Sequence, residues 1–279
     1  MAAQNAGRPF RFGVVAAPQG GGDQWRRLAQ RVEQLGYSTL LSPDGLQLLS
    51  PVAALAVAAS VTARLRVGTF VMASPLRPPW LAAWDAHSLS VLTGGRFELG
   101  IGTGRPEVAA QVAELEGQPL SSPARRLAQV EQAIDRLREL DGDQRTPVMI
   151  AASGPKARAL AAAKADIVTL AAGPLATRDE MGLLCQDLLA KAGARAANIE
   201  LAMNIFVVGE DVPPWMAQFM GVDSAALRAA DSLAMLRGTT QQMVDDLRRR
   251  RDAFGASYIS VNSAFFEQMA PVVEQLNGR

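Results

Sequence analysis

The sequence contains a single cysteine, Cys185, and a single histidine, His87, among its 279 residues. One cysteine excludes an intramolecular disulfide and favours a reducing compartment, so we expect a cytoplasmic protein. One histidine and one cysteine argue against a zinc site or a histidine-based catalytic triad. We therefore expect no metal, and we interpret His87 as a packed or surface residue of a helix.

The chain also lacks a charge excess and a long membrane-like run. Lys and Arg number 28 against 27 Asp and Glu, which argues against nucleic acid or an anionic membrane as the main partner. One basic run occurs, Arg248 to Arg251, and we interpret it as a solvated helix face. The longest uncharged run, residues 45–63, contains Pro51 and indicates a buried loop and helix. The start of the sequence shows no apolar signal core.

Short apolar runs and longer periodic runs alternate along the chain, and hydrophobic residues make up 49% of it. The pattern predicts strands at 12–17, 38–42, 65–72, 96–101, 147–152, 166–172, 199–208 and 257–261. It predicts helices at 23–35, 51–62, 79–92, 123–140, 156–164, 177–192, 240–254 and 265–276. Eight such units imply an α/β protein, a single (β/α)8 TIM-barrel domain over residues 1–279, with an open doubly wound sheet as the alternative.

In such a barrel the active site lies at the carboxyl ends of the strands, where reactive side chains are scarce in this sequence. The main carboxylates there are Asp44 and Glu107, and they belong to different units, so hydrolytic acid–base chemistry is poorly supported. Small residues dominate instead, at 102–104, 151–155 and 171–173. A barrel without reactive groups of its own usually takes them from a cofactor.

The glycine-rich stretch GGRFELGIGTGRPE, residues 94–107, is a candidate phosphate loop. Its spacing, G-x-G-x-G from Gly100, differs from the G-x-G-x-x-G of dinucleotide-binding folds, because Arg105 occupies the third glycine position. A better anion site is SGPKARAL, where Ser153, Gly154 and the amides of Lys156 and Ala157 would lie at a helix N-terminus. The alternative is an ordinary short turn with a proline at the first helical position.

Four segments of the sequence resemble the bacterial-luciferase-like monooxygenase family, whose members use FMN or coenzyme F420. The segments are LGYSTLLSPDGLQLLSPVAALAVAAS, LRVGTFVMASPLRPPWLAAWDAHSLSVLTGGRFELGIGTG, VMIAASGPKARALAAAKADIVTLA and RRRRDAFGASYISV. The resemblance covers nearly the whole chain and implies the same barrel fold. It also implies a non-prolyl cis peptide at Phe70–Val71 or one bond later, and a homodimer.

The resemblance implies a set of cofactor-binding positions. These are Asp44, Phe70, Val71, Met72, Thr103, Gly104, Ala152, Ser153, Gly154, Pro155, Lys156, Ala172 and Gly173. Gly94 and Gly95 would turn the chain into its strand, while Gly102, Thr103 and Gly104 would line the flavin side of the pocket.

Two positions depart from the family pattern, and they leave the catalytic residues open. Many members read P-D-H where this chain has Pro43-Asp44-Gly45, and many deazaflavin members have an acid where this chain has Arg105. Asp44 and Arg105 are the catalytic candidates. Asp44 would orient the ring as a hydrogen-bond acceptor or cap a turn, and Arg105 would orient an anionic group or be an exposed structural residue.

The leading function is therefore hydride transfer between a reduced deazaflavin, coenzyme F420, or a flavin and a small organic substrate. An FMN-dependent monooxygenase that uses molecular oxygen is the first alternative. A flavin-binding protein without turnover is the second.

Overall fold

The structure, a computed structural model, describes residues 7–279. Its strands are β1 (Arg11–Val15), β2 (Thr39–Ser42), β3 (Arg66–Thr69), β4 (Met72–Ala73), β5 (Phe97–Gly102), β6 (Val148–Ala152), β7 (Ile167–Leu170), β8 (Glu200–Ile205), β9 (Val207–Val208), β10 (Met235–Leu236) and β11 (Ala256–Asn262). Its α-helices are α1 (Gly22–Gln34), α2 (Pro51–Ser60), α3 (Pro79–Leu92), α4 (Pro106–Glu116), α5 (Pro123–Asp141), α6 (Pro155–Lys164), α7 (Arg178–Ala192), α8 (Pro214–Met220), α9 (Ser224–Ala229), α10 (Thr240–Phe254) and α11 (Phe266–Leu276). Short 3₁₀ turns occupy Ser74–Leu76 and Gly193–Asn198.

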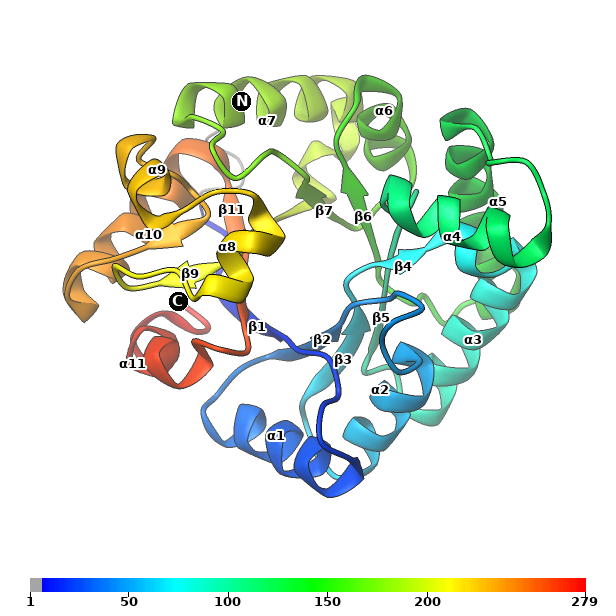
Figure 1. The fold of residues 1–279 in the computed structure, drawn as a ribbon, viewed down its shortest axis with the longest axis horizontal. Coiled ribbons are helices and arrows are strands. Elements are labelled where there is room, and N and C mark those ends of the chain that lie inside the picture. The colour runs from blue at the N-terminus through cyan, green and yellow to red at the C-terminus, as the bar shows by residue number, and fades with distance from the viewer. Residues whose placement is uncertain (1–6) are drawn as a thin grey trace.

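The main sheet is a closed parallel barrel. Its strands follow the order β3-β2-β1-β11-β8-β7-β6-β5-β4, and pairing of β3 with β5 closes the ring. Helices surround the strands, as Figure 1 shows in a view that looks into the ring. The predicted (β/α)8 fold is confirmed, and the open-sheet alternative is wrong.

The barrel strands are apolar because both of their faces are covered. Alternate residues point outward into the core between strands and helices, where Val14, Leu40 and Leu99 are fully buried. The other residues point into the barrel. At its amino-terminal end, Arg11 donates to Glu98 and Glu200, and a layer with Tyr258 and Met149 follows.

The sequence prediction missed several elements. Helix α4 was not predicted, although Pro106 begins it and Gly117, with φ of 61°, ends it. The strand predicted at 199–208 is divided into β8 and β9. The rest of the excursion, α8, α9 and β10, was not predicted, because its helices are short and its strand is two residues long. The single strand predicted at 65–72 is divided into β3 and β4, with the cis peptide Phe70–Val71 between them.

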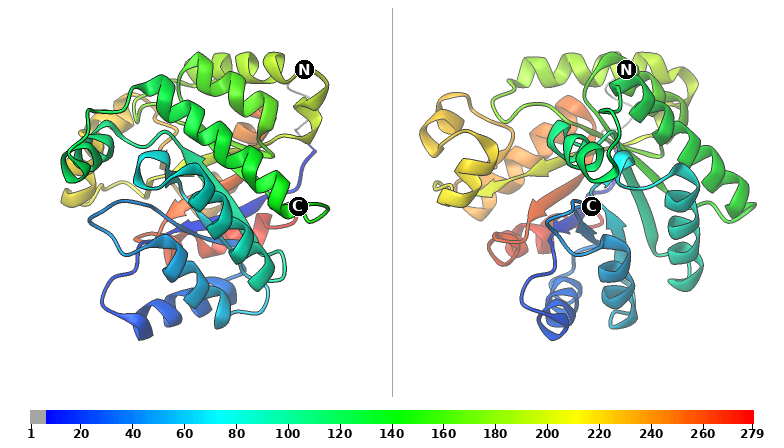
Figure 2. Two further views of the ribbon diagram at one scale, coloured as in Figure 1. Left: turned by 90° about the vertical axis from the view of Figure 1, so that its right-hand side faces the viewer. Right: turned by 45° about the vertical axis from the view of Figure 1, so that its right-hand side comes forward.

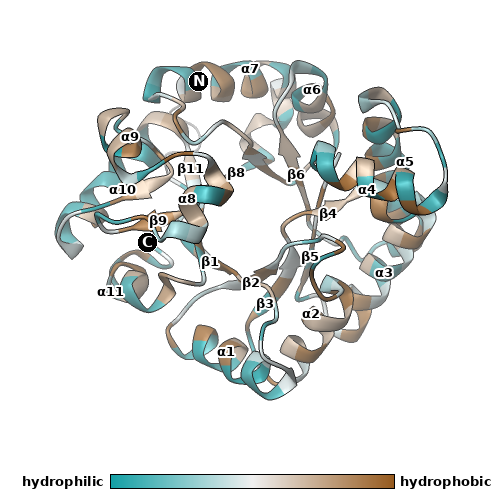
Figure 3. Cartoon of the chain, in the orientation of Figure 1, coloured by the Kyte–Doolittle hydropathy of each residue, from teal (hydrophilic) through white to brown (hydrophobic). Residues whose placement is uncertain are grey.

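The helices differ in how their apolar residues are distributed. Helices α3 and α5 pack side by side along one side of the barrel (Figure 2). Figure 3 colours α2 brown to white along its length, whereas α1 alternates between brown and teal. Within residues 7–279, no helix combines the length and apolarity needed to cross a membrane.

Candidate functional site

A cavity of about 240 Å³, here called the inner cavity, lies at the carboxyl ends of β6, β7 and β8. The cis-linked residues Phe70 and Val71 form part of its wall. Its other lining residues are Ala151, Val168, Thr169, Leu170, Ala171, Ala172, Gly173, Pro174, Ala176, Met181, Cys185, Leu201, Ala202, Met203, Asn204, Phe206, Leu233, Ala234, Phe254 and Ala256. An apolar cavity with a few polar groups at this end of a barrel is typical of a small-molecule site.

The polar groups of the inner cavity are few and well positioned. Ser260 Oγ donates to Asn204 Oδ1 across 2.9 Å, which fixes the Asn204 amide plane. Within the described chain, Asn204 Nδ2 has no protein acceptor, so it is available to donate to a ligand. Thr169 also lines the cavity. Cys185 is its one ionisable lining residue, and burial raises the pKa of this thiol to about 12, so the thiol is neutral.

A second hollow of about 840 Å³, here called the mouth groove, adjoins the inner cavity. The two share the segment 171–174 and Ala176 as a common wall, and Ser153, Met220 and Val222 line the groove. Ser153 leads into α6, whose N-cap Gly154 supplies no side-chain cap. The first backbone N–H groups of α6, on Lys156 and Ala157, therefore have no acceptor within the helix and point out of its N-terminal end.

Asp44 is held by the protein itself. Its carboxylate forms an ion pair with Arg77, at 2.6 Å, and accepts the backbone N–H of Ala73, at 3.0 Å. Its side chain is 3% exposed and does not line the inner cavity. Gly45 is also buried, and a Cβ there would meet the side-chain amide of Gln47. Asp44 thus anchors the chain just after the cis peptide.

Arg105 is exposed at the start of α4, and its guanidinium carbon lies 4.5 Å from the ring centroid of Phe219 in α8. This contact joins the end of β5 to the excursion between β8 and β11, so α4 and α8 lie at the same end of the barrel. A guanidinium over an aromatic face is a favourable contact. Arg105 lines neither the inner cavity nor the mouth groove.

Gly100 and Gly102 of the 94–107 stretch serve close packing. A Cβ on Gly100 would lie 1.9 Å from the carbonyl oxygen of Thr69, and one on Gly102 would lie 3.0 Å from Val71. Thr69 Oγ1 donates to the Gly100 carbonyl and accepts the Gly100 N–H. These glycines therefore allow the cis-linked segment to lie against β5. Gly94 and Gly95, both with positive φ, form the predicted turn.

The predicted cofactor residues fall into three groups. Phe70, Val71, Ala172 and Gly173 line the inner cavity, and Ser153 lines the mouth groove. Gly154, Pro155 and Lys156 form the N-terminus of α6, next to Ser153. Lining neither hollow are Asp44, Met72, Thr103, Gly104 and Ala152, of which Met72 and Ala152 are at most 1% exposed.

Several lining residues were not predicted. Asn204 lies at the end of a strand, a place where barrel sites occur, so its position was a usable signal. Leu233 and Ala234 come from the excursion between β8 and β11, which has no regular sequence pattern.

The single histidine of the chain, His87, has a structural role. His87 Nδ1 is 2.9 Å from the buried carboxylate of Asp141, which links α3 to α5 and fits the predicted packed histidine. Among residues 7–279, no group of three or more His, Cys, Asp or Glu side chains is arranged to hold a metal ion.

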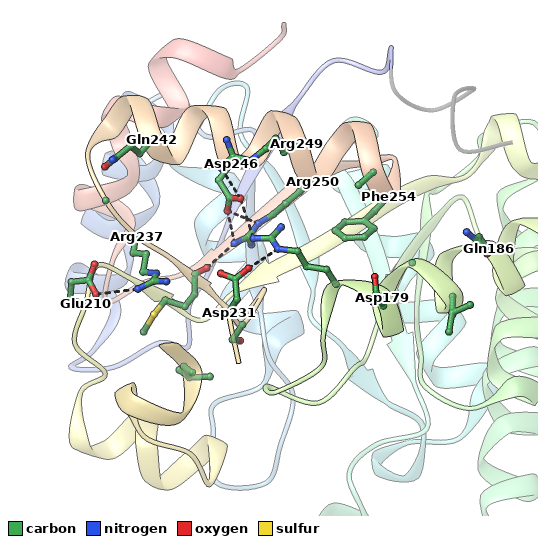
Figure 4. Close-up of a pocket in the computed structure, with 18 residues that line it drawn as sticks. Asp179, Gln186, Glu210, Asp231, Arg237, Gln242, Asp246, Arg249, Arg250 and Phe254 are labelled. Atoms are coloured by element: carbon green, nitrogen blue, oxygen red, sulfur yellow. Dashed lines mark hydrogen bonds and ion pairs between the residues drawn. The ribbon is translucent and has the colours of Figure 1, made fainter. Parts of the chain in front are cut away.

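The prediction of a solvated face for Arg248 to Arg251 is wrong for Arg250. Arg248 and Arg249 are 48% and 67% exposed, but Arg250 is 2% exposed. Figure 4 shows Arg250 extending from α10 with dashed lines to Asp246. The run follows the helical turn, so Arg250 faces inward while Arg248 and Arg249 face water, and the half-buried Arg251 lies over the ring of Phe10.

Comparisons with known proteins agree with this fold. A model of the luciferase-like monooxygenase family matches residues 9–254. The 4-hydroxyprotoasukamycin monooxygenase of Streptomyces nodosus subsp. asukaensis is 40% identical over 87 residues, which cover 29% of this chain and 24% of that enzyme. The curated relatives are matched over 24% to 42% of their length, so the chain spans less than half of them.

Solved structures share the barrel over nearly its full length. The coenzyme F420 dependent tetrahydromethanopterin reductase from Methanopyrus kandleri has a TM-score of 0.74 and 16% identity, covering 97% of this chain and 99% of that one. A long-chain alkane monooxygenase has a TM-score of 0.73 and 13% identity, covering 96% and 91%.

The fold and the site thus define an α/β-barrel protein with an apolar cavity at the carboxyl ends of its strands. The chain belongs to the luciferase-like monooxygenase family, which comprises flavin- and coenzyme F420-dependent oxidoreductases and monooxygenases.

Proposed function

We propose that this protein is an oxidoreductase that moves a hydride between a reduced coenzyme F420, or a flavin, and a small organic substrate. The observation that carries the proposal is the lining of the inner cavity, where the one ionisable residue is the neutral thiol of Cys185. Such a lining provides no general base or nucleophile for hydrolysis. Hydride chemistry needs an oriented pair of reactants and a water-poor site, and a bound cofactor supplies the hydride.

The residues fit a cofactor with a flat apolar ring and an anionic tail. The inner cavity, at about 240 Å³, is smaller than the roughly 300–1,000 Å³ typical of ligand pockets, but it adjoins the mouth groove. Apolar walls such as Phe70 and Leu170 would cover a ring and exclude water. Asn204 Nδ2 would donate to a ring carbonyl or to the substrate. The start of α6, with Gly154 open to space, would hold an anionic group.

The protein's own part in the reaction is then orientation. Asp44 keeps Ala73 and Arg77 in place and leaves proton transfer to the cofactor, the substrate or water. Arg105, held over Phe219, lies at the same end of the barrel and would contact an anionic substrate group only after leaving that ring. Neither catalytic candidate directly faces the inner cavity.

The competing functions differ in a measurable way. The partial identity to a Streptomyces monooxygenase supports an FMN-dependent monooxygenase that consumes oxygen. A flavin-binding protein without turnover would bind a cofactor and leave it unreacted. We also expect the protein to act in a reducing compartment such as the cytoplasm, since Cys185 is free and buried.

The test begins with binding titrations of coenzyme F420 and of FMN, followed by absorbance and fluorescence. The reduced form of whichever binds is then mixed with candidate acceptors in single-turnover experiments, with and without oxygen. Anaerobic oxidation of the cofactor by an acceptor supports the proposal, and a strict need for oxygen favours the monooxygenase. Absence of binding to both cofactors would refute the whole assignment.

Gly154→Val tests the cofactor tail site. A valine there would occupy the open approach to the helix start, and we expect affinity for the bound cofactor to fall tenfold or more, about 1.4 kcal/mol. Ala159→Val, on the exposed side of the same helix, is the matched control and should bind normally. Unchanged affinity in a folded Gly154→Val protein would remove this residue from the site.

We propose in addition that the protein is a homodimer that pairs through the outer faces of α2 and α3. Helix α2, PVAALAVAAS, has no charged residue, and the outward Trp80 and Trp84 of α3 are 60% and 57% exposed. Val91 and Leu92 at the end of α3 are 51% and 81% exposed. Helices that are apolar all round are normally buried, which a second copy would achieve.

A further inference from the structure

The segment Ser232 to Met235 is a thin partition between two hollows. Leu233 and Ala234 line the inner cavity, whereas Ser232 and Met235 line a pocket of about 1140 Å³ on the outside of the barrel. This outer space, here called the side pocket, lies between α7 and α10 and is drawn in Figure 4. The position of this partition therefore sets the width of the inner cavity on one side.

One buried side chain holds most of the partition. Arg250 donates to the carbonyl of Leu233 at 2.7 Å and to the carbonyl of Met235 at 2.8 Å, and its Nη1 lies 3.7 Å from Met203 Sδ. Two of these three partners, Leu233 and Met203, line the inner cavity. A guanidinium is the one side chain whose fixed fork reaches two carbonyls and a carboxylate at once.

The charge of Arg250 is compensated from the side pocket. Burial lowers the pKa of its guanidinium below the usual value, and Asp246, at 2.7 Å, counteracts this. Arg178 of α7 bridges Asp246 and Asp231, the residue that precedes the partition. Asp231 has a φ of 44°, in the left-handed region, so the chain turns sharply where the partition begins.

The remaining contacts of the partition lead to the strand ends. Ser232 Oγ donates to the carbonyl of Pro174, which lines both the inner cavity and the mouth groove. The Ala234 carbonyl accepts the N–H groups of Phe206 and Val207 at 2.8 and 3.1 Å. Movement of the partition would therefore move the ends of β7 and β8, where the proposed cofactor site lies.

We propose that Arg250 is a positioning residue that clamps the partition from the side pocket and so fixes the shape of the inner cavity. The effect of Arg250 on cofactor and substrate rests on the proposed function, whereas its role in holding the partition does not. Loss of the clamp lets Leu233 and Ala234 move, which opens the cavity to solvent and weakens the hold on a flat ring. Substrate size preference then broadens, because the wall that limits it is no longer fixed.

The sole cysteine provides a readout that needs no cofactor. Cys185 lies in the inner cavity and is 6% exposed, so its alkylation rate by N-ethylmaleimide in the folded protein reports opening of the cavity. We expect Arg250→Ala to react at least tenfold faster than the wild type, with methylguanidinium, but not methylammonium, restoring the slow rate. Arg248→Ala, exposed on α10 and paired with Asp245 instead of Asp246, is the matched control and should react like the wild type.

Cofactor binding provides the second readout. Arg250→Ala should bind the cofactor about tenfold more weakly, and methylguanidinium should restore binding. Urea unfolding of each variant verifies that the comparison is between folded proteins. If Arg250→Ala does not fold, Arg250→Lys makes the same test, since an ammonium keeps the charge beside Asp246 but cannot reach both carbonyls.

The outcomes separate this proposal from the proposed function. A wild type that binds neither cofactor refutes the function, while the Cys185 rates still decide whether Arg250 clamps the cavity. Faster Cys185 alkylation that methylguanidinium reverses supports the clamp. Equal Cys185 rates in the folded Arg250 variant, the Arg248 variant and the wild type would overturn it.

Discussion

Glu33, near the end of α1, shows how one side chain can hold a loop in place. Its Oε1 accepts the backbone N–H groups of Ala63, Arg64 and Leu65 at 3.0, 2.7 and 2.8 Å. These residues lead directly into β3. Burial alone would raise the pKa of Glu33, but these three donors outweigh it and lower the pKa below its usual value.

Glu33→Gln should destabilise the protein at neutral pH by about 1 kcal/mol, because a neutral amide accepts these bonds less strongly. A carboxylate with a lowered folded-state pKa stabilises above its unfolded pKa and loses this effect as pH falls through the folded value. The difference in melting temperature between wild type and variant should therefore shrink as pH falls below 4.5, the ordinary value for Glu. Glu114→Gln, exposed on α4, is the control, and a pH-independent difference would contradict the prediction.

Single residues were predictable where a local rule governs them. The glycine pair at 94–95 and the cis peptide at Phe70–Val71 followed from local signals, the latter through the family resemblance. The burial of Arg250 did not, because its neighbours in the run are equally basic and tertiary packing alone decides which one faces inward. Asn204 stood at a strand end, but its pairing with Ser260 joins strands distant in sequence.

At the scale of elements, an ion network joins strands across the amino-terminal end of the barrel. Arg11 of β1 pairs with Glu98 of β5 at 2.8 Å and Glu200 of β8 at 2.7 Å, while Arg66 of β3 also pairs with Glu98. The Arg11 guanidinium lies 3.5 Å from the centroid of the Tyr258 ring of β11. Burial alone would lower the pKa of Arg11, but Glu98, Tyr258 and Glu200 together raise it above its usual value.

Arg11→Met should cost about 3 kcal/mol of unfolding free energy, because it leaves the carboxylate of Glu200 partly buried without its cation. Urea unfolding measures this directly. Arg145→Met, which removes an arginine that is 61% exposed and paired with Asp166, is the control and should cost less than about 1 kcal/mol. Equal costs for the two variants would show that the network is not a structural tie between strands.

The alternation of strands and helices predicted the barrel because each unit is long enough to show the hydrophobic periodicity of a strand or a helix. The parts that escaped prediction, α4 and the excursion that includes α8 and α9, are short or irregular, and tertiary contacts decide their conformation. This limit affects the candidate site most. Leu233 and Ala234 complete the inner cavity, and they lie in the excursion that no periodicity reveals.

At the scale of the whole molecule, α3 carries a group of exposed large apolar side chains. The outward residues of α3 follow a helical stripe, Trp80, Trp84 and then Val91, with Leu92 beside it. The charged or ionisable residues of α3 are Asp85 and His87, and His87 is bonded to Asp141 inside the chain. Burial raises the pKa of Asp85, and Arg77 counteracts this. Few charges therefore oppose burial of this face against a second copy.

We expect the wild type to elute at about twice the 29.6 kDa of one chain when its mass is measured by light scattering during size-exclusion chromatography. Trp84→Glu should shift it toward the monomer, because a symmetric interface would place a carboxylate in the apolar contact twice. Trp215→Glu changes another exposed tryptophan, 54% exposed on α8, and should leave the mass unchanged. A wild type that stays monomeric at tens of micromolar would reject the dimer. A Trp84→Glu protein that stays dimeric would move the interface away from α3.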